Sequence, residues 1–250
     1  MTIELKEHGN GVVSLFLARP EKRNALNSEM VLALQNAGRS LAENDELRVV
    51  VLEGAGDRVF SAGADVNELS RLNPDTARAF ITNLYEGIEA VRDIPVPVIC
   101  KIQGACIGGA MELAATCDLR IAGTNATFCM PEVRVGIPSV IQAALLPRLM
   151  GKGRADWMVL SGDVIDANTA YDWGFIEKCV APDQLNSTTD EAVQSILSSA
   201  PQAIRTQKRL CRGWDDQSTA DAIAVSIDAF AASYQSSEPA DYLAKMTKKP

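Results

Sequence analysis

The chain has 250 residues, of which 47% are hydrophobic and 22% charged, and its net charge is −8. This composition fits one large globular domain, or one domain with an appendage, and excludes a largely disordered chain. The acidic balance argues against a general nucleic-acid binder and against a protein that binds anionic membranes.

The first half of the chain alternates between strand and helix patterns. Met30, Leu34, Ala37 and Leu41 recur with the period of one helix face. Helix followed by strand at this spacing suggests β/α units. In chain order we predict a hairpin of residues 3–6 and 12–17, a helix over 30–41, a buried strand at 48–52, a helix over 66–72, a helix over 74–93 and a strand at 96–100.

The second half begins with a strand at 119–123 and becomes helical towards its end. We predict an apolar helix that follows Ser139 and runs to Met150, helices at 152–160 and 167–173, and a last strand at 177–180. From Pro182 onward the pattern is helical. Because sheet-forming character ceases near 182–200, we divide the chain into a core of residues 1–190 and a C-terminal helical region of residues 191–250. Lys248 and Lys249 form an expected basic tail.

Two glycine-containing turns link predicted strands to helices. Residues 61–65 (SAGAD) form the first, and Gly108–Gly109 the second. Small residues at a helix start let a ligand approach free N–H groups, and two such turns can supply the converging donors of an oxyanion hole. Alternatively, Asp65 is simply a helix cap, and the second pair of glycines permits close helix packing.

Two glutamates stand out near the second turn. Glu112 has almost only apolar neighbours and falls about one turn into the helix that the glycines open, and Glu132 follows twenty positions later. A carboxylate buried without a partner is costly, and general acid–base catalysis needs one group that takes a proton and one that gives it. For Glu132, a solvated position or a pair with Arg134 is the alternative.

Several kinds of site lack support in the sequence. His8 is the single histidine and there is no G-x-S-x-G motif, so a Ser-His-Asp hydrolase is not indicated. No cluster has metal-ligand spacing, and nucleotide-binding glycine motifs are missing. The six cysteines include no C-x-x-C pair, and we expect reduced, structural thiols. Without a signal peptide or an apolar run of ~20 residues, we expect a soluble, cytoplasmic protein.

The motifs, in order and over nearly the whole chain, resemble those of the crotonase family, the enoyl-CoA hydratase/isomerase superfamily. They are RPEKRNALNSEM from Arg19, FSAGADVNEL from Phe60, KIQGACIGGAMELAATCDLRIA from Lys101, MPEVRVGIP from Met130 and WGFIEKCV from Trp173. The resemblance implies a crotonase-like α/β fold, a spiral core of repeated ββα turns with two sheets. It also implies a C-terminal helical region that packs at a trimer interface, and a homo-trimer or a hexamer that is a dimer of trimers.

The resemblance further implies an acyl-CoA thioester substrate, with coenzyme A as part of that substrate and no separate cofactor. Glu112 and Glu132 match the two catalytic glutamates of the family's hydratases, and the Ala64 and Gly109 amides match its oxyanion hole. Glu112 would take a proton from water and Glu132 would give one to Cα. The residues expected to line the coenzyme A path are Arg23, Ala25, Ala62, Asp65, Val66, Ile107 and Gly108, with the Ala62 carbonyl meeting the adenine.

Possession of both glutamates favours an enoyl-CoA hydratase. The alternatives are an enoyl-CoA isomerase, other enolate chemistry such as C–C hydrolysis or decarboxylation, and a non-catalytic acyl-CoA-binding or RNA-associated member. The chain departs from the common hydratases at residues 138–144, PSVIQAA, where those have a glycine-rich run. Larger side chains at Val140, Ile141 and Gln142 are expected to narrow or reshape the acyl pocket.

Overall fold

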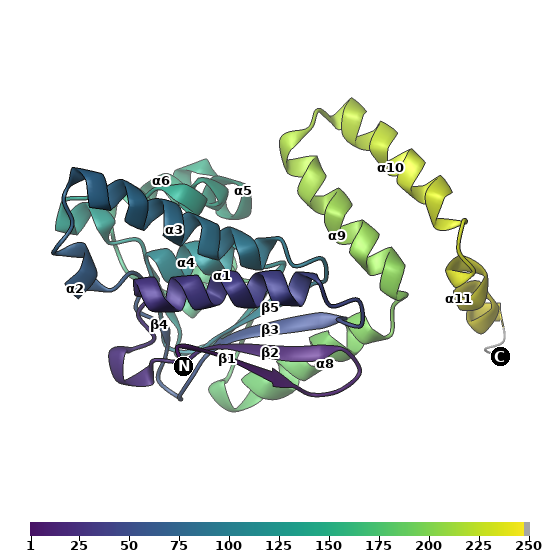
Figure 1. Ribbon diagram of the computed structural model, residues 1–250, viewed down its shortest axis with the longest axis horizontal. Coiled ribbons are helices and arrows are strands. Elements are labelled where there is room, and N and C mark those ends of the chain that lie inside the picture. The colour runs from purple at the N-terminus through teal and green to yellow at the C-terminus, as the bar shows by residue number, and fades with distance from the viewer. Residues whose placement is uncertain (248–250) are drawn as a thin grey trace.

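The computed structural model describes residues 1–247, so Lys248 and Lys249 lie outside the described residues. Two sheets form its centre (Figure 1). The larger has the order β1-β2-β3-β5-β7-β10 and the smaller β4-β6-β8-β9. The strands of the larger sheet are β1 (Ile3–Glu7), β2 (Val12–Leu17), β3 (Val49–Gly54), β5 (Val98–Ile102), β7 (Leu119–Gly123) and β10 (Lys178–Val180). Those of the smaller sheet are β4 (Val59–Ser61), β6 (Ala105–Ile107), β8 (Thr127–Cys129) and β9 (Ile165–Asp166).

The chain winds repeatedly between the sheets, which gives the ββα spiral core. The pairs β3 and β4, β5 and β6, and β7 and β8 each place one strand in the large sheet and the next in the small sheet, before a helix follows. Within each sheet these strands run parallel, whereas β1–β2 and β8–β9 are antiparallel. Parallel neighbours bring their carboxyl ends to the same edge, and this arrangement aligns the turns after β4 and β6.

Helices cover both faces of the larger sheet (Figure 1). On one face α1, α3 and α4 bury the main core, and on the other α8 packs Leu185 and Val193 against Val49, Ile99 and Ile121. The α-helices of the core are α1 (Ser28–Ala42), α2 (Val66–Leu69), α3 (Pro74–Arg92), α4 (Gly109–Thr116), α5 (Leu146–Met150), α6 (Lys152–Ser161), α7 (Ala167–Asp172) and α8 (Leu185–Leu197). The 3-10 helices are η1 (Pro20–Lys22), η2 (Glu132–Val135), η3 (Ile141–Leu145) and η4 (Pro182–Gln184).

Most predicted elements are present, with shifts at their ends. The hairpin forms, and the periodic residues Met30, Leu34, Ala37 and Leu41 are all buried on α1. The predicted strand 96–100 is observed two residues later as β5, and the helix predicted over 66–72 ends at Leu69. The single helix predicted between Ser139 and Met150 is wrong, because η3 and α5 replace it. Pro147 has no N–H to continue a helical hydrogen-bond ladder through this point.

Three further helices, α9 (Pro201–Asp216), α10 (Thr219–Ser233) and α11 (Glu238–Thr247), form a C-terminal arm that extends from the body (Figure 1). The root of the arm is fixed by Lys208, which is 7% exposed. Its Nζ donates to Val96 O at 2.9 Å and lies 2.7 Å from Asp118 Oδ2, which also accepts from Val98 N. The division of the chain at residue 190 stays a prediction. Residue 190 lies inside α8, which packs on the sheet, and the arm begins after it with α9.

We expect Lys208→Met to destabilise the protein by about 3 kcal/mol, because it leaves the partly buried Asp118 carboxylate without its cation. Chemical unfolding of wild type and variant measures this difference. Lys152→Met is the matched control: the Lys152–Asp156 pair is exposed and four residues apart on one helix, and its loss should cost about 0.5 kcal/mol. Equal losses for the two variants would contradict the role given to Lys208.

Across residues 1–247, no helix is both long and apolar enough to cross a membrane. All six cysteines are free, and Cys100, Cys106, Cys117 and Cys129 are buried, as expected for structural thiols. His8 is exposed, with its Nε2 2.9 Å from Ser14 Oγ.

Candidate active site

The two glycine turns meet at the carboxyl ends of β4 and β6. These strands pair in parallel, with Ser61 opposite Cys106. Gly63 has a φ of +80°, and a β-carbon built on it would lie 2.4 Å from Ile107 O and 3.3 Å from Gly109 N. Only glycine therefore allows the first turn to approach the second this closely.

Two backbone amides lie side by side at this contact. A β-carbon built on Gly109 would lie 3.8 Å from Ala64 N. Gly109 is the first residue of α4, where a helix leaves its N–H groups without intrahelical acceptors. Within residues 1–247, neither the Ala64 N–H nor the Gly109 N–H donates to another group of the protein. These two neighbouring amides are thus free to donate to an external group.

Glu112 lies in the first turn of α4, and every residue of this helix is buried. Only 4% of Glu112 is exposed, and its Oε1 accepts a hydrogen bond from Ala143 N at 3.2 Å. Burial and the nearby charge of Glu132 raise the pKa of Glu112 to about 8, although hydrogen bonds from the Ala143 and Val140 amides oppose this shift. The side chain therefore retains a proton at neutral pH and can exchange it near pH 8.

Glu132 begins η2 and reaches back over the second turn. Its Oε2 accepts from Ser139 Oγ at 2.9 Å, and its Oε1 lies 2.4 Å from the position of a β-carbon built on Gly108. Gly108 has a φ of +54°, which also favours glycine. The pair with Arg134 left open by the sequence is not formed, because Arg134 lies against Asp163 and donates to Ser161 O instead.

A loop at residues 19–26 supports the first turn from the side. Arg19 Nη1 donates to Ala25 O at 2.7 Å and lies 3.1 Å from Asp65 Oδ2. Leu26 exchanges backbone hydrogen bonds with the turn, from its N–H to Gly63 O and from Asp65 N to its carbonyl. Burial alone would raise the pKa of Asp65, but hydrogen bonds from Arg19 and Asn67 outweigh it and hold this pKa below its ordinary value. Asp65 also caps α2, as the structural alternative anticipated.

The other residues expected on the coenzyme A path surround these turns. Val66 and Arg23 are exposed, Ala25, Ala62 and Ile107 are half-buried, and Asp65 and Gly108 are buried. The Ala62 N–H donates to Arg23 O, so loop and turn are joined here. Beside them is a hollow of about 380 Å³, lined by Pro20, Arg23, Asn24, Ala55, Gly56, Asp57, Arg58 and Val59. In the part of the chain that the structure describes, no group of three or more His, Cys, Asp or Glu side chains could hold a metal ion.

The sequence did not reveal the groups that hold the acids. Ser139 and the Ala143 amide both come from the segment that departs from the glycine-rich pattern. Of the three large residues expected to narrow the pocket, Gln142 is buried and its amide is turned towards α3. The signal that was available is Ser139, since it is the one hydroxyl in that segment.

Comparisons with known proteins agree with this architecture. Residues 7–243 match the model of the family described as enoyl-CoA hydratase/isomerase. The short-chain-enoyl-CoA hydratase of Clostridium acetobutylicum is 30% identical over 95% of this chain and 92% of its own. The crotonyl-CoA hydratase of Syntrophomonas wolfei is 33% identical over 86% of this chain and 84% of its own. The crystal structure of an enoyl-CoA hydratase from Bacillus anthracis superposes with a TM-score of 0.95 at 28% identity, covering 99% of this chain and 96% of that one.

Proposed function

Because the chain belongs to the enoyl-CoA hydratase/isomerase family, we propose that it catalyses the reversible addition of water to a 2-enoyl-CoA thioester, which gives a 3-hydroxyacyl-CoA. One observation carries the proposal: two acids, Glu112 and Glu132, adjoin the free amide of Gly109 at the start of α4 and the neighbouring free amide of Ala64. Hydration uses both features in one step.

The amides of Ala64 and Gly109 bind the thioester oxygen. They stabilise the negative charge that develops there as the enolate forms, which makes Cβ electrophilic; each donor contributes about 3–4 kcal/mol in comparable oxyanion holes. Along the path of coenzyme A, the Ala62 carbonyl meets the adenine, and Arg23 supplies positive charge at the adjoining hollow. Coenzyme A arrives as part of the substrate, and the mechanism uses no separate cofactor.

The glutamates move the protons. They hold a water molecule over Cβ; Glu112 takes one proton from it as its oxygen bonds to Cβ, and Glu132 gives a proton to Cα. The raised pKa of Glu112 leaves one proton on this pair near neutral pH, and hydration starts from the form in which that proton lies on Glu132 and Glu112 is ionised. Microscopic reversibility makes the same pair dehydrate a 3-hydroxyacyl thioester.

Incubation with crotonyl-CoA and product analysis test this function. We expect 3-hydroxybutyryl-CoA, formed with loss of the absorbance of the conjugated enoyl thioester. If that product is absent with crotonyl-CoA and with longer 2-enoyl thioesters, hydration is excluded. Conversion of a 3-enoyl-CoA to its 2-enoyl isomer would then identify an isomerase on the same enolate chemistry.

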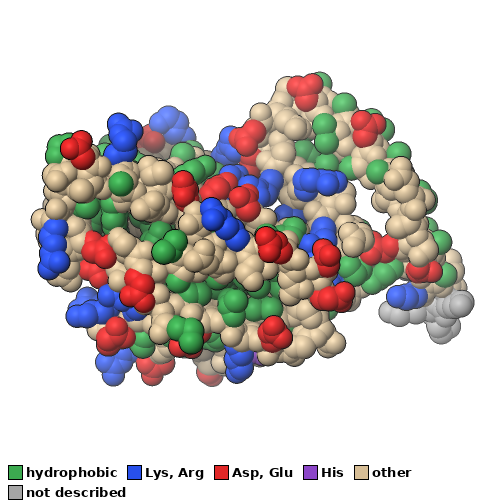
Figure 2. All heavy atoms as spheres, viewed as in Figure 1, with side chains coloured by type: hydrophobic (Ala, Val, Ile, Leu, Met, Phe, Trp, Pro, Cys, Tyr) green, Lys and Arg blue, Asp and Glu red, His purple; other side chains and the backbone are tan. Residues whose placement is uncertain are grey.

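We also propose that the arm joins copies of the chain into a homo-trimer, or into a dimer of trimers, in the cytoplasm. Apolar side chains of α10 are uncovered along the arm (Figure 2), with Ile223, Ile227 and Phe230 56%, 63% and 68% exposed. Uncovered apolar surface of this kind marks a protein interface. These three side chains also line a groove of about 480 Å³. Its other lining residues are Trp214, Gln217, Thr219, Ala222 and Ser226.

Phe230→Glu should shift the protein towards monomers, because the assembly would have to bury a charge in an apolar contact. Sedimentation velocity or light scattering measures the mass. Leu32→Glu is the control, since Leu32 is 58% exposed on α1 in the body and receives the same charge. An unchanged mass for the Phe230 variant, or equal dissociation of both variants, would count against assembly through the arm.

A further inference from the structure

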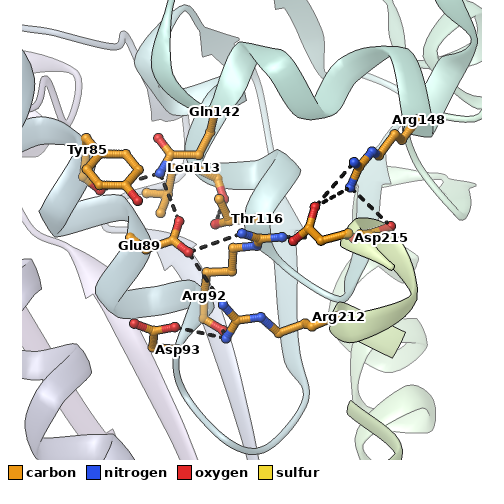
Figure 3. Close-up of polar contacts among 11 residues, drawn as sticks. Tyr85, Glu89, Arg92, Asp93, Leu113, Thr116, Gln142, Arg148, Arg212 and Asp215 are labelled. Carbon is orange, nitrogen blue, oxygen red and sulfur yellow. Dashed lines mark hydrogen bonds and ion pairs between the residues drawn. The ribbon is translucent and has the colours of Figure 1, made fainter. Parts of the chain in front are cut away.

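Gln142 is a buried polar residue that the mechanism does not use. It lies in η3, is 4% exposed, and its Nε2 donates to Glu89 Oε2 at 3.1 Å and to the Tyr85 carbonyl at 3.4 Å (Figure 3). Its other amide atom, Oε1, is buried without a partner among the described residues. An unsatisfied buried carbonyl costs about 1–3 kcal/mol. Fold stability alone therefore does not explain a glutamine here.

The partner of Gln142 is itself held by two arginines (Figure 3). Glu89 Oε1 accepts from Arg92 Nη1 at 3.1 Å and lies 3.4 Å from Arg212 Nη2. Arg212 belongs to α9, at the root of the arm, and also pairs with Asp93 at 2.9 Å. Because cations from two helices hold the Glu89 carboxylate, Gln142 donates to a fixed acceptor.

The backbone next to Gln142 holds a catalytic candidate. Ala143 N donates to Glu112 Oε1 at 3.2 Å, and the Val140 amide also hydrogen-bonds the Glu112 carboxyl. Between them Ile141 has a φ of 42°, which is strained for a β-branched residue. Such a conformation persists only where its surroundings hold it in place.

We propose that Gln142 is a positioning residue: its hydrogen bond to Glu89 holds the turn of residues 140–143 so that the backbone amides of this turn bind the Glu112 carboxylate. The contacts then run without a break from Arg212 on α9, through Glu89 and Gln142, to Glu112. The effect on turnover rests on the proposed function, whereas the effect on Glu112 itself does not.

Gln142→Met tests the proposal, because methionine keeps the length of the side chain and removes both the hydrogen bond and the unpartnered oxygen. We expect kcat to fall about 10- to 100-fold, as for a misplaced catalytic group, with KM changed by less than about threefold. Hydrogen bonds from the turn favour the ionised form of Glu112, so their loss should raise its pKa further above about 8. The acidic limb of the kcat–pH profile should move to higher pH accordingly.

A merely structural glutamine would not move this profile. Arg148→Gln is the control, since Arg148 is 47% exposed and, among the described residues, its ion pairs are with Asp215 and Asp216 of α9 and not with Glu89. Its profile should match that of the wild type.

Infrared titration of the Glu112 carboxyl, identified by its loss in Glu112→Gln, gives a readout without substrate. A higher pKa in Gln142→Met supports the proposal even if the wild type hydrates no enoyl-CoA, so the two failures can be told apart. An unchanged pKa overturns it, whether or not kcat falls. If Gln142→Met does not fold, Gln142→Leu removes the same amide and takes its place in both measurements.

Discussion

Glu112→Gln should lower kcat by about 100- to 10,000-fold, because it removes the group that exchanges a proton with the attacking water. The amide has nearly the size of the carboxyl, so the packing of α4 around it is preserved. The affinity for a coenzyme A thioester should change little, since the Ala64 and Gly109 amides remain in place. Steady-state hydration of crotonyl-CoA, with binding of an unreactive acyl-CoA as the control, separates the two effects.

The free energy of unfolding of Glu112→Gln should also depend on pH differently from that of the wild type. The pKa of Glu112 rises from an ordinary 4.5 to about 8 on folding. The contribution of Glu112 to the free energy of unfolding is thus largest below pH 4.5. It falls as pH rises from there and levels off above about pH 8, where both the folded and the unfolded protein carry the ionised carboxylate. Glutamine does not ionise. Relative to the variant, the wild type should therefore lose stability between pH 4.5 and about 8, by up to about 5 kcal/mol.

Urea unfolding of both proteins at several pH values measures this difference. A constant difference across the range would show that Glu112 does not change its pKa on folding. Full hydratase activity in the variant would remove Glu112 from the mechanism.

Gly63→Ala should damage catalysis through the backbone. The added methyl group would lie 2.4 Å from Ile107 O, so the two turns must separate and their amides can no longer share one acceptor. Loss of one oxyanion-hole donor costs about 100- to 1,000-fold in kcat. The left-handed φ adds about 1–2 kcal/mol of strain to the folded state.

Gly9→Ala is matched to this change. Gly9 also has a φ of +80°, and a β-carbon there would have no neighbour within 4 Å. Its variant should show the strain in unfolding experiments and retain normal turnover. If Gly63→Ala keeps its activity, or if both variants lose it equally, the approach of the two turns is not what binds the thioester oxygen.

The parts of the structure that depend on local pattern could be predicted from the sequence. The spacing of Met30, Leu34 and Leu41 identifies the buried face of α1, and the apolar neighbours of Glu112 indicate its burial. Each of these signals is contained in a short stretch of the chain. Predicted boundaries shifted where a tertiary hydrogen bond decides them. Asp118 binds Val98 N at the start of β5, two residues after the predicted start of that strand.

The parts that depend on contacts between distant residues could not be predicted. Arg134 was a reasonable partner for Glu132 by proximity along the chain, yet it pairs with Asp163, which lies beyond α6. Gln142 is expected from the sequence to reshape the acyl pocket, and nothing near it along the chain indicates its hydrogen-bond partner Glu89, 53 positions earlier. Propensity and spacing carry no information on such pairs, since they arise only when the spiral brings its turns together.

The complete burial of α4 also bears on how the site can evolve. All eight of its residues, Gly109–Thr116, are enclosed by the core, so a larger side chain at any of them would overpack the interior. The reactive groups are thereby tied to a segment with little tolerance for mutation. Divergence towards new acyl groups must therefore come from the rim, around the partly exposed α2 and at the exposed Ile137 and Val140, which lie outside this helix.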